Sequence, residues 1–280
     1  MIASWLIAAG LQAASPATPW RPEGVSSDQF ESHPAPDPLT GDLYFVRSAP
    51  NFSGWRILVS RCAGGRLMAA EPAPFSGAGV EADPYFAADG RRVYFISSRA
   101  DPPAKTGDDL DIWMVERGAE GRWGAPARLP APVNSPAAEW FPRSDGRGGL
   151  YFGSGRDGGF GQTDIYHAVP EAGGWRVENV GGTVSTADDE YEFEPSRDGR
   201  FAVLMSEGAL FRLERSGSSW GPRQPIGTGL AGLHVGPTLS PSGRTLLFAA
   251  RDGARSGELF RIGEGETWPA SCGGGGGERG

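Results

Sequence analysis

The stretch EADPYFAADGRRVYFISSR, residues 81–99, combines the features of a β-hairpin. Asp89-Gly90 is a tight-turn dipeptide, and Val93 to Ile96 is an unbroken apolar run. Glycine adopts the positive φ angle that a two-residue hairpin turn needs. Apolar and aromatic residues are typical of a strand buried on both faces. The stretch therefore predicts two antiparallel strands joined by a tight turn.

The same pattern occurs five times along the chain. Each copy has a Glu or His, then a Pro three residues later, then a Gly-containing turn and an apolar run. The anchor residues are Glu31, Glu81, Glu139, Glu192 and His234. Their separations of 50, 58, 53 and 42 residues match the length of one β-propeller blade.

Two more strands are expected in each copy. The expected third strands are 56–60, 111–115, 164–166, 210–213 and 258–262. A tryptophan opens the expected fourth strand in four copies, namely Trp123, Trp175, Trp220 and Trp268, and the first copy has Leu67-Met68 instead. With 44 Gly and 24 Pro among 280 residues, the composition also favours short strands and turns over long helices.

The sequence therefore predicts an all-β fold, a single propeller of five four-stranded blades over residues 18–271, with six blades as the alternative. The segment from Trp20 to Pro22 resembles a fourth strand without a preceding blade. We expect residues 20–27 to pair with the last blade and so close the ring. Trp268 competes for the same place, because it could begin that fourth strand itself.

Several of these segments resemble a known family. Glu-x-x-Pro, residues 89–99 and Asp111-Ile-Trp113 are similar to the TolB-like, WD40-like β-propeller repeat, as are the loop pieces 129–135 and 156–161. The resemblance covers roughly residues 20–270. It implies an exported bacterial propeller that makes protein–protein contacts at the cell envelope. Copies one and five depart from the pattern because their turns lack Asp.

The chain ends and the cysteines bear on localisation. Residues 1–15, MIASWLIAAGLQAAS, resemble a secretory signal peptide, although their beginning has no Lys or Arg, and the alternative is an apolar N-terminus that is retained. We therefore expect a periplasmic or secreted protein. Residues 272–280 are expected to form a disordered Gly-rich tail. Cys62 and Cys272 either form one disulfide or stay as free thiols.

Neither the net charge nor the short motifs of the sequence point to nucleic-acid binding, catalysis or metal binding. The net charge is −8 and no Lys/Arg cluster occurs, so we expect no nucleic-acid partner. Gly217-Ser-Ser-Trp-Gly221 matches a hydrolase pattern but lies in an expected hairpin. Three scattered histidines do not make a metal motif, and the acidic run 188–194 is interpreted as a solvated charged face, with a Ca²⁺ site as the alternative. The sequence indicates no catalytic residue, no metal, no cofactor and no transmembrane span.

One rim of the ring is expected to collect charged side chains. Strand one begins there, strand two returns there and strand three starts there, which should give that rim a repeated Glu–Arg–Asp set. The structural interpretation is an ion-paired collar, and the functional interpretation is a polar channel mouth that binds a ligand or partner. The candidate binding residues are Glu31, Glu81, Glu139, Glu192, His234, Arg47, Arg99, Arg156 and Arg251, and the acids of strand three are Asp111, Asp164 and Glu258.

Blade four has Ser206-Glu207 where the other copies have Arg, so Glu192 is expected to lack its partner and to mark an opening. The sequence predicts a non-catalytic binding module for another envelope or secreted protein. The alternative is a hydrolase acting on glycans or peptides with carboxylates at the channel mouth. Rim glutamates that all face arginine favour the binding module, and two free carboxylates about 5–9 Å apart favour the hydrolase.

Overall fold

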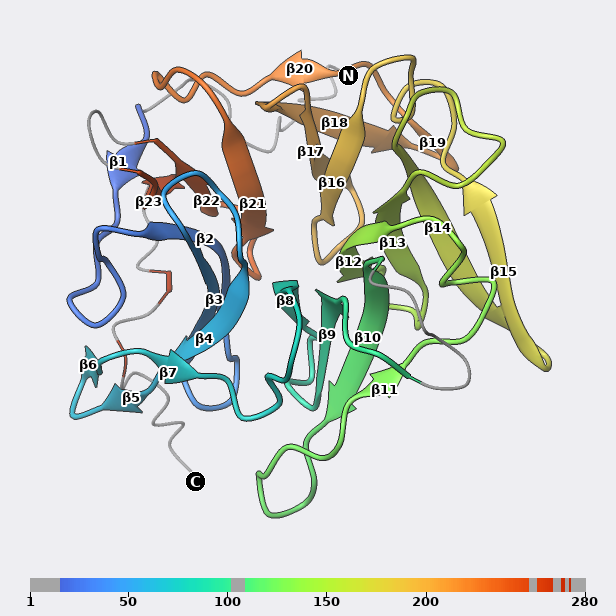
Figure 1. The fold of residues 1–280 in the computed structure, drawn as a ribbon. Coiled ribbons are helices and arrows are strands. Elements are labelled where there is room, and N and C mark those ends of the chain that lie inside the picture. The colour runs from blue at the N-terminus through green and yellow to red at the C-terminus, as the bar shows by residue number, and fades with distance from the viewer. Residues whose placement is uncertain (1–15, 102–108, 252–255, 264–267, 270–271, 273–280) are drawn as a thin grey trace, which may run out of the picture.

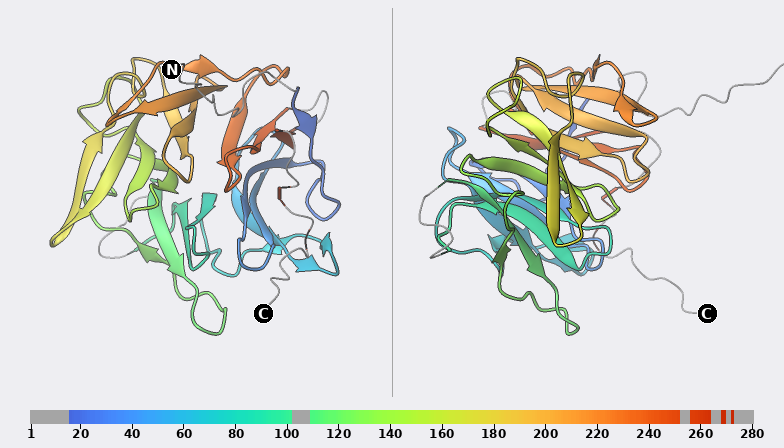
Figure 2. Two further views of the ribbon diagram at one scale, coloured as in Figure 1. Left: turned by 180° about the vertical axis from the view of Figure 1, so that it is seen from behind. Right: turned by 90° about the vertical axis from the view of Figure 1, so that its right-hand side faces the viewer.

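The structure is a computed structural model that describes residues 16–101, 109–251, 256–263, 268–269 and 272. The expected signal peptide and the expected tail beyond Cys272 lie outside this part of the chain. The described residues form strands and turns without any helix, and the strands build five sheets around one axis (Figure 1, Figure 2). The predicted all-β propeller is confirmed, with five blades rather than six.

Each blade is a meander of four strands. The innermost strands are β2 (Phe30–Pro36), β8 (Glu81–Phe86), β12 (Glu139–Ser144), β16 (Glu190–Pro195) and β21 (His234–Leu239). The second strands are β3 (Leu43–Ser48), β9 (Arg92–Ser97), β13 (Leu150–Ser154), β17 (Phe201–Ser206) and β22 (Leu246–Ala250). The third strands are β4 (Arg56–Ser60), β10 (Asp111–Glu116), β14 (Asp164–Glu171), β18 (Ala209–Ser216) and β23 (Glu258–Ile262).

The outermost strands are β7 (Glu71–Pro72), β11 (Ala127–Arg128), β15 (Gly174–Asn179), β20 (Gln224–Pro225) and, in blade five, β1 (Thr18–Pro19). Blade four also carries β19 (Ser219–Trp220), and β5 (Cys62–Ala63) and β6 (Arg66–Leu67) form a separate hairpin after β4. Several expected openings of the fourth strands are therefore wrong in detail. Leu67 lies in that hairpin and not in the fourth strand, Trp123 precedes β11 without opening it, and Trp220 lies in β19, ahead of β20.

Aromatic side chains fill the space between neighbouring blades. Between blades one and two, the Tyr44 ring stacks on Phe75 at 5.8 Å and meets Phe86 edge-on at 5.1 Å. Trp123 donates its indole N–H to the Tyr44 hydroxyl at 2.9 Å, so this buried phenol is satisfied. Burying a side chain of this size stabilises the fold by roughly 1.5–3 kcal/mol. The Tyr-Phe runs of the second strands therefore supply the contacts between blades.

The structure corrects the anchor residue of blade four. In blade two, Glu81 opens the first strand and lies opposite Ser97. The residue in this position of blade four is Glu190, opposite Ser206, and not Glu192. The β-bulge of blade four follows its anchor directly, whereas the other blades place the bulge beside the proline. The Glu-x-x-Pro match in blade four is therefore two residues out of register with the other four.

The N-terminal segment closes the ring. β1 pairs with β23 of the last blade, where Thr18 lies opposite Arg261. The Trp20 N–H extends this ladder by donating to the Leu259 carbonyl at 2.8 Å. Pairing protects the edge of β23 that would otherwise be open. The predicted closure by N- and C-terminal segments is confirmed.

The expected closing strand over residues 20–27 is wrong. Pro22 has no N–H for a ladder, and its carbonyl accepts hydrogen bonds from Val25 and Ser26 at 2.9 and 3.0 Å. This turn leads the chain into β2. Trp268 lies outside any strand, and within the described residues the fourth strand of blade five is β1, from the N-terminal side.

We expect a chain that begins at Arg21 to be less stable than one that begins at Pro16 by roughly 2–3 kcal/mol, because the β1 ladder and the packing of Trp20 are lost together. Urea-induced unfolding of the two chains measures the difference. Equal unfolding midpoints would show that the ring closes without β1.

Cys62 and Cys272 form a disulfide, with their Cα atoms 5.3 Å apart. Cys62 belongs to the hairpin that follows β4 of blade one, and the bond spans 210 residues of the chain. The sequence left open whether these cysteines pair. They meet because blade one and blade five are neighbours in the closed ring.

Candidate functional site

Four glutamates mark the face on which the first strands begin. All four side chains are fully buried, and we call this cluster, together with its arginines, the collar: Glu31, Glu81, Glu139 and Glu190. Three of them accept a hydrogen bond from a Ser or Thr hydroxyl four residues earlier, at 2.5 to 2.8 Å. Glu81 instead accepts the Gly77 N–H at 3.1 Å. The carboxylates thus tie each first strand to the connection that precedes it.

Each collar glutamate also pairs with an arginine. The pairs are Glu31–Arg47 at 2.8 Å, Glu81–Arg99, Glu139–Arg156 at 3.0 Å and Glu190–Arg223. Each arginine donates further to a backbone carbonyl in the connection before its blade, at Val25, Phe75, Val133 and Val184. A planar guanidinium can serve a carboxylate and a carbonyl at once. These contacts agree with the structural interpretation, in which an ion-paired collar holds the strands and the connections together.

Blade four has no opening of the expected kind. Arg223, in the connection between β19 and β20, supplies the guanidinium that the second strand lacks. Glu192 also has partners, since it lies 3.0 Å from His33 Nε2 and accepts the Gly236 N–H at 2.8 Å. The expectation that Glu192 lacks a partner is therefore wrong.

Blade five departs from the collar pattern. His234 takes the position of the glutamate, and its Nε2 lies 2.9 Å from the Thr228 hydroxyl. Its Nδ1 lies 3.0 Å from the Gly208 carbonyl in blade four. Arg251, at the end of the second strand, is exposed.

The acids of the third strands do not join the collar as the expected Glu–Arg–Asp sets. Each is engaged by a separate partner, so each supports a different loop. The partners are Arg128 for Asp111 at 2.7 Å, the Phe160 N–H for Asp164 at 2.6 Å and the Ser26 hydroxyl for Glu258 at 3.0 Å.

Further along the axis, His33 bridges three blades. Its Nε2 lies 3.0 Å from Glu192 and 3.1 Å from Asp83, and its Nδ1 lies 2.9 Å from the Ser32 hydroxyl. Burial lowers the pKa of His33, but Asp83 and then Glu192 raise it by more, so the pKa lies above the usual 6.5. The imidazole ring, held between two carboxylates, links blades one, two and four across the channel.

We expect His33→Gln to destabilise the protein by roughly 2 kcal/mol at about pH 6 and by less at about pH 9. The raised pKa of His33 contributes stability that is fully present below the unfolded value of 6.5 and is lost as pH rises through the folded pKa. Urea unfolding of both proteins across this range checks the result. A stability difference that grows with pH would contradict it.

Two residues beyond Glu192 and Asp83 along their strands lies a second polar layer, centred on Arg143. This side chain is 1% exposed, and its Nε donates to Glu194 at 2.5 Å. Its guanidinium lies over the rings of Phe141 at 3.4 Å and Tyr85 at 4.9 Å. Burial raises the pKa of Glu194, although Arg143 opposes this effect. The pair joins blades three and four through the middle of the propeller.

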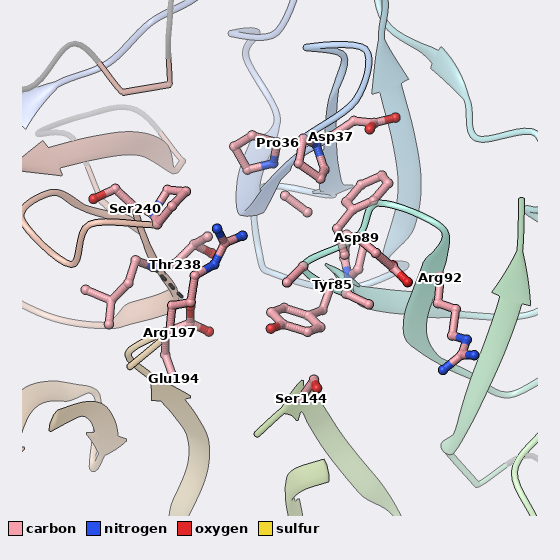
Figure 3. A pocket seen from close by; sticks show the side chains of 18 of the residues that line it. Pro36, Asp37, Tyr85, Asp89, Arg92, Ser144, Glu194, Arg197, Thr238 and Ser240 are labelled. Carbon is pink, nitrogen blue, oxygen red and sulfur yellow. Dashed lines mark hydrogen bonds between the residues drawn. The ribbon is translucent and has the colours of Figure 1, made fainter. Parts of the chain in front are cut away.

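On the face opposite the collar, the hairpin turns of all five blades surround a cavity of about 920 Å³, which we call the hairpin-face pocket. Residues 34–41, 84–89, 144–146, 194–197 and 238–241 line it, together with Trp268, Pro269 and Cys272. Figure 3 shows Tyr85, Glu194 and Arg197 among the side chains that line it. The disulfide therefore holds the C-terminal segment against the rim of this pocket.

The sequence located the collar in part and missed the pocket. The Ser or Thr four residues before the glutamate recurs as Ser27, Ser135 and Thr186, and this spacing would have identified Glu190. Arg223 carries no local signal, because it reaches the collar from a different part of its blade. Among the described residues, no group of three or more His, Cys, Asp or Glu could hold a metal ion, and no helix could span a membrane.

The comparisons with known proteins support the fold. No family model and no curated protein matches this sequence. TolB from Acinetobacter baumannii is 20% identical, with a TM-score of 0.54 over 85% of this chain and 54% of that chain. A protein assigned as TolB from Agrobacterium tumefaciens is 20% identical, with a TM-score of 0.51 over 81% of this chain and 72% of that chain. A gluconolactonase from Xanthomonas campestris is 12% identical, and its TM-score of 0.48 is too low for a functional comparison.

The fold and the site together define a five-bladed β-propeller with buried polar side chains along its axis and a pocket on the hairpin face. This chain spans 54% of the length of the first TolB structure, so the likeness concerns the propeller. The chain has the TolB-like β-propeller fold.

Proposed function

We propose that this protein is an exported, non-catalytic propeller that binds a partner polypeptide in the hairpin-face pocket. The main observation in favour of this function is the hairpin-face pocket. It is a cavity of about 920 Å³ on the propeller axis, and every blade contributes a turn to it. Concave sites with apolar walls and a few polar groups are the usual binding sites of proteins.

The collar supports a structural role on the opposite face. Its carboxylates are fully buried and paired with arginines, so they offer a partner little to contact. We therefore place the binding site away from Glu31, Glu81 and Glu139 and at the other mouth of the channel.

The same pairing disfavours the hydrolase. A glycosidase needs two carboxyl groups that are available to substrate, about 5–9 Å apart. The axial acids Glu192 and Glu194 are held by His33 and Arg143. These contacts use the carboxylates for structure, which favours binding over hydrolysis.

The disulfide supports export. Disulfides persist in oxidising compartments such as the periplasm and the extracellular space. The Cys62–Cys272 bond and the apolar residues 1–15 therefore agree in favouring an exported protein. A partner in the envelope or outside the cell follows from that location.

Blocking the pocket tests the proposal. Ala88 is an exposed residue that lines the pocket, and Ala119 is an exposed residue on a turn that does not. We expect Ala88→Trp to reduce capture of a specific envelope protein at least tenfold, whereas Ala119→Trp leaves capture unchanged. Equal capture by the two variants, or no specific capture by the original chain, would overturn the proposal.

A further inference from the structure

The pocket wall contains three carboxylates that already contact a basic side chain of the protein. Each has a basic partner that lies outside the pocket lining. The pairs are Asp37–Arg117, Asp145–His167 at 3.0 Å and Glu194–Arg143 at 2.5 Å. A fourth acid, Asp89, sits on an exposed turn and accepts the Arg91 N–H at 2.9 Å. The wall is therefore less acidic toward a ligand than its residue types suggest.

Arg197 differs from the other charged residues of the wall. It lines the pocket, is exposed, and makes no ion pair or hydrogen bond within the part of the chain that the structure describes. Its side chain extends into the space between Pro36 and Tyr85 (Figure 3). Arg200, three residues later, pairs with Asp198 at 2.7 Å and lies outside the lining. Arg197 is thus a cation directed into the pocket.

Tyr85, which lines the same pocket, supplies a second donor. The phenol is half-buried on β8, and among the described residues its hydroxyl has no hydrogen-bond partner. Burial and then Glu194 raise the pKa of Tyr85, while Arg143 and Arg197 oppose them with a smaller effect. The hydroxyl therefore stays protonated at neutral pH and can donate to an oxygen in the pocket.

Much of the remaining wall consists of prolines and other apolar residues, next to Ser and Thr hydroxyls. Proline offers no N–H, and its ring fixes the backbone, so a wall of prolines suits an apolar or aromatic group. Trp268 and Leu239 add to this surface. The prolines of the lining are Pro34, Pro36, Pro38, Pro84, Pro195, Pro241 and Pro269.

We propose that the hairpin-face pocket binds a carboxylate carried on an apolar or aromatic body, with Arg197 and Tyr85 as the donors. A guanidinium fork matches the two oxygens of a carboxylate, and the Tyr85 hydroxyl in the same pocket adds a third donor. This inference rests on the proposed partner-binding function and names the group that the partner presents. That group is either a C-terminal carboxylate or an acidic side chain next to an apolar residue.

Three small molecules distinguish a C-terminal carboxylate from an acidic side chain as the bound group. N-acetylphenylalanine carries a terminal carboxylate, N-acetylglutamyl-phenylalaninamide carries one on a side chain, and N-acetylphenylalaninamide carries none. Their binding is followed by backbone amide shifts of the pocket residues in NMR titrations. We expect one of the two carboxylates to bind at least tenfold more tightly than the neutral amide, and the tighter one identifies the source. Equal binding of all three, or no binding of either carboxylate, would overturn the inference.

Substitutions of Arg197 and Tyr85 test whether these two side chains donate hydrogen bonds to the carboxylate. Arg197→Gln should weaken the carboxylate probe at least tenfold and leave the neutral amide unchanged, and Tyr85→Phe should weaken it severalfold. Arg200→Gln, from the same turn, should change neither, and circular dichroism checks that every variant is folded. Equal affinities of the Arg197→Gln and Arg200→Gln proteins would refute the role of Arg197.

The titrations with small probes do not require the partner protein. The proposal of partner binding and the proposal of carboxylate binding can therefore be refuted independently. If Ala88→Trp loses partner capture and Arg197→Gln keeps it, partner binding in the pocket is supported and recognition of a carboxylate by Arg197 is contradicted. If the carboxylate probes bind but no protein is captured, the carboxylate site is supported and the proposal of a polypeptide partner is contradicted.

Discussion

Replacing Cys62 and Cys272 together by serine should lower the free energy of unfolding by about 3–5 kcal/mol. The bond closes a loop of 210 residues, and in the chain-entropy model a loop of this length restricts the unfolded chain strongly. The bond also joins blade one to the segment beyond blade five, so its loss removes one of the contacts that close the ring. Urea unfolding of the two proteins under oxidising conditions measures the effect.

Reduction provides the control for this experiment. A reductant should destabilise the original protein by a similar amount and should leave the double serine variant unchanged. Each single serine variant should resemble the double one, since either change removes the bond. An unfolding midpoint that is the same with and without reductant would contradict the predicted contribution of the disulfide.

Replacing Arg143 by methionine should cost about 3–5 kcal/mol of stability, because it leaves the Glu194 carboxylate buried without its cation. Arg143 is 1% exposed and donates to Glu194 at 2.5 Å. The variant also loses the contact of the guanidinium with the Phe141 ring at 3.4 Å. The free energy of unfolding from urea titrations gives the size of the effect.

A double-mutant cycle separates the charge from the packing. Arg143→Met combined with Glu194→Met removes both charges and should recover a large part of the lost stability. Arg200→Met is the matched control, because its pair with Asp198 is exposed and should be worth less than about 1 kcal/mol. If Arg143→Met and Arg200→Met cost the same, the axial ion pair does not hold the blades together.

Much of the fold could be predicted because each blade is encoded locally. A turn such as Asp89-Gly90 and an apolar run such as Val93 to Ile96 lie next to each other in the chain, and their chemistry selects a hairpin. The repeat at separations of 42 to 58 residues then predicts a ring of such units. Local chemistry and its recurrence were sufficient for the fold class, the blade count and the use of the N-terminal segment in closure.

The register of blade four could not be predicted in the same way. Glu192 matches the Glu-x-x-Pro pattern, yet Glu190 occupies the collar position. The bulge that shifts the pattern arises from how β16 pairs with β17, and one inserted residue changes which side chains face the axis. The local pattern around Pro195 does not contain this information.

By itself, the sequence determined the propeller, its five blades and the three collar pairs that Glu31, Glu81 and Glu139 form with arginines at the ends of the second strands. Only the tertiary structure decided the contacts across the axis, such as His33 with Glu192, and the pocket that the five sets of turns enclose. The reason is distance along the chain. Hairpins depend on neighbours within one blade, whereas the channel and the pocket exist only once the closed ring brings all five first strands to one axis.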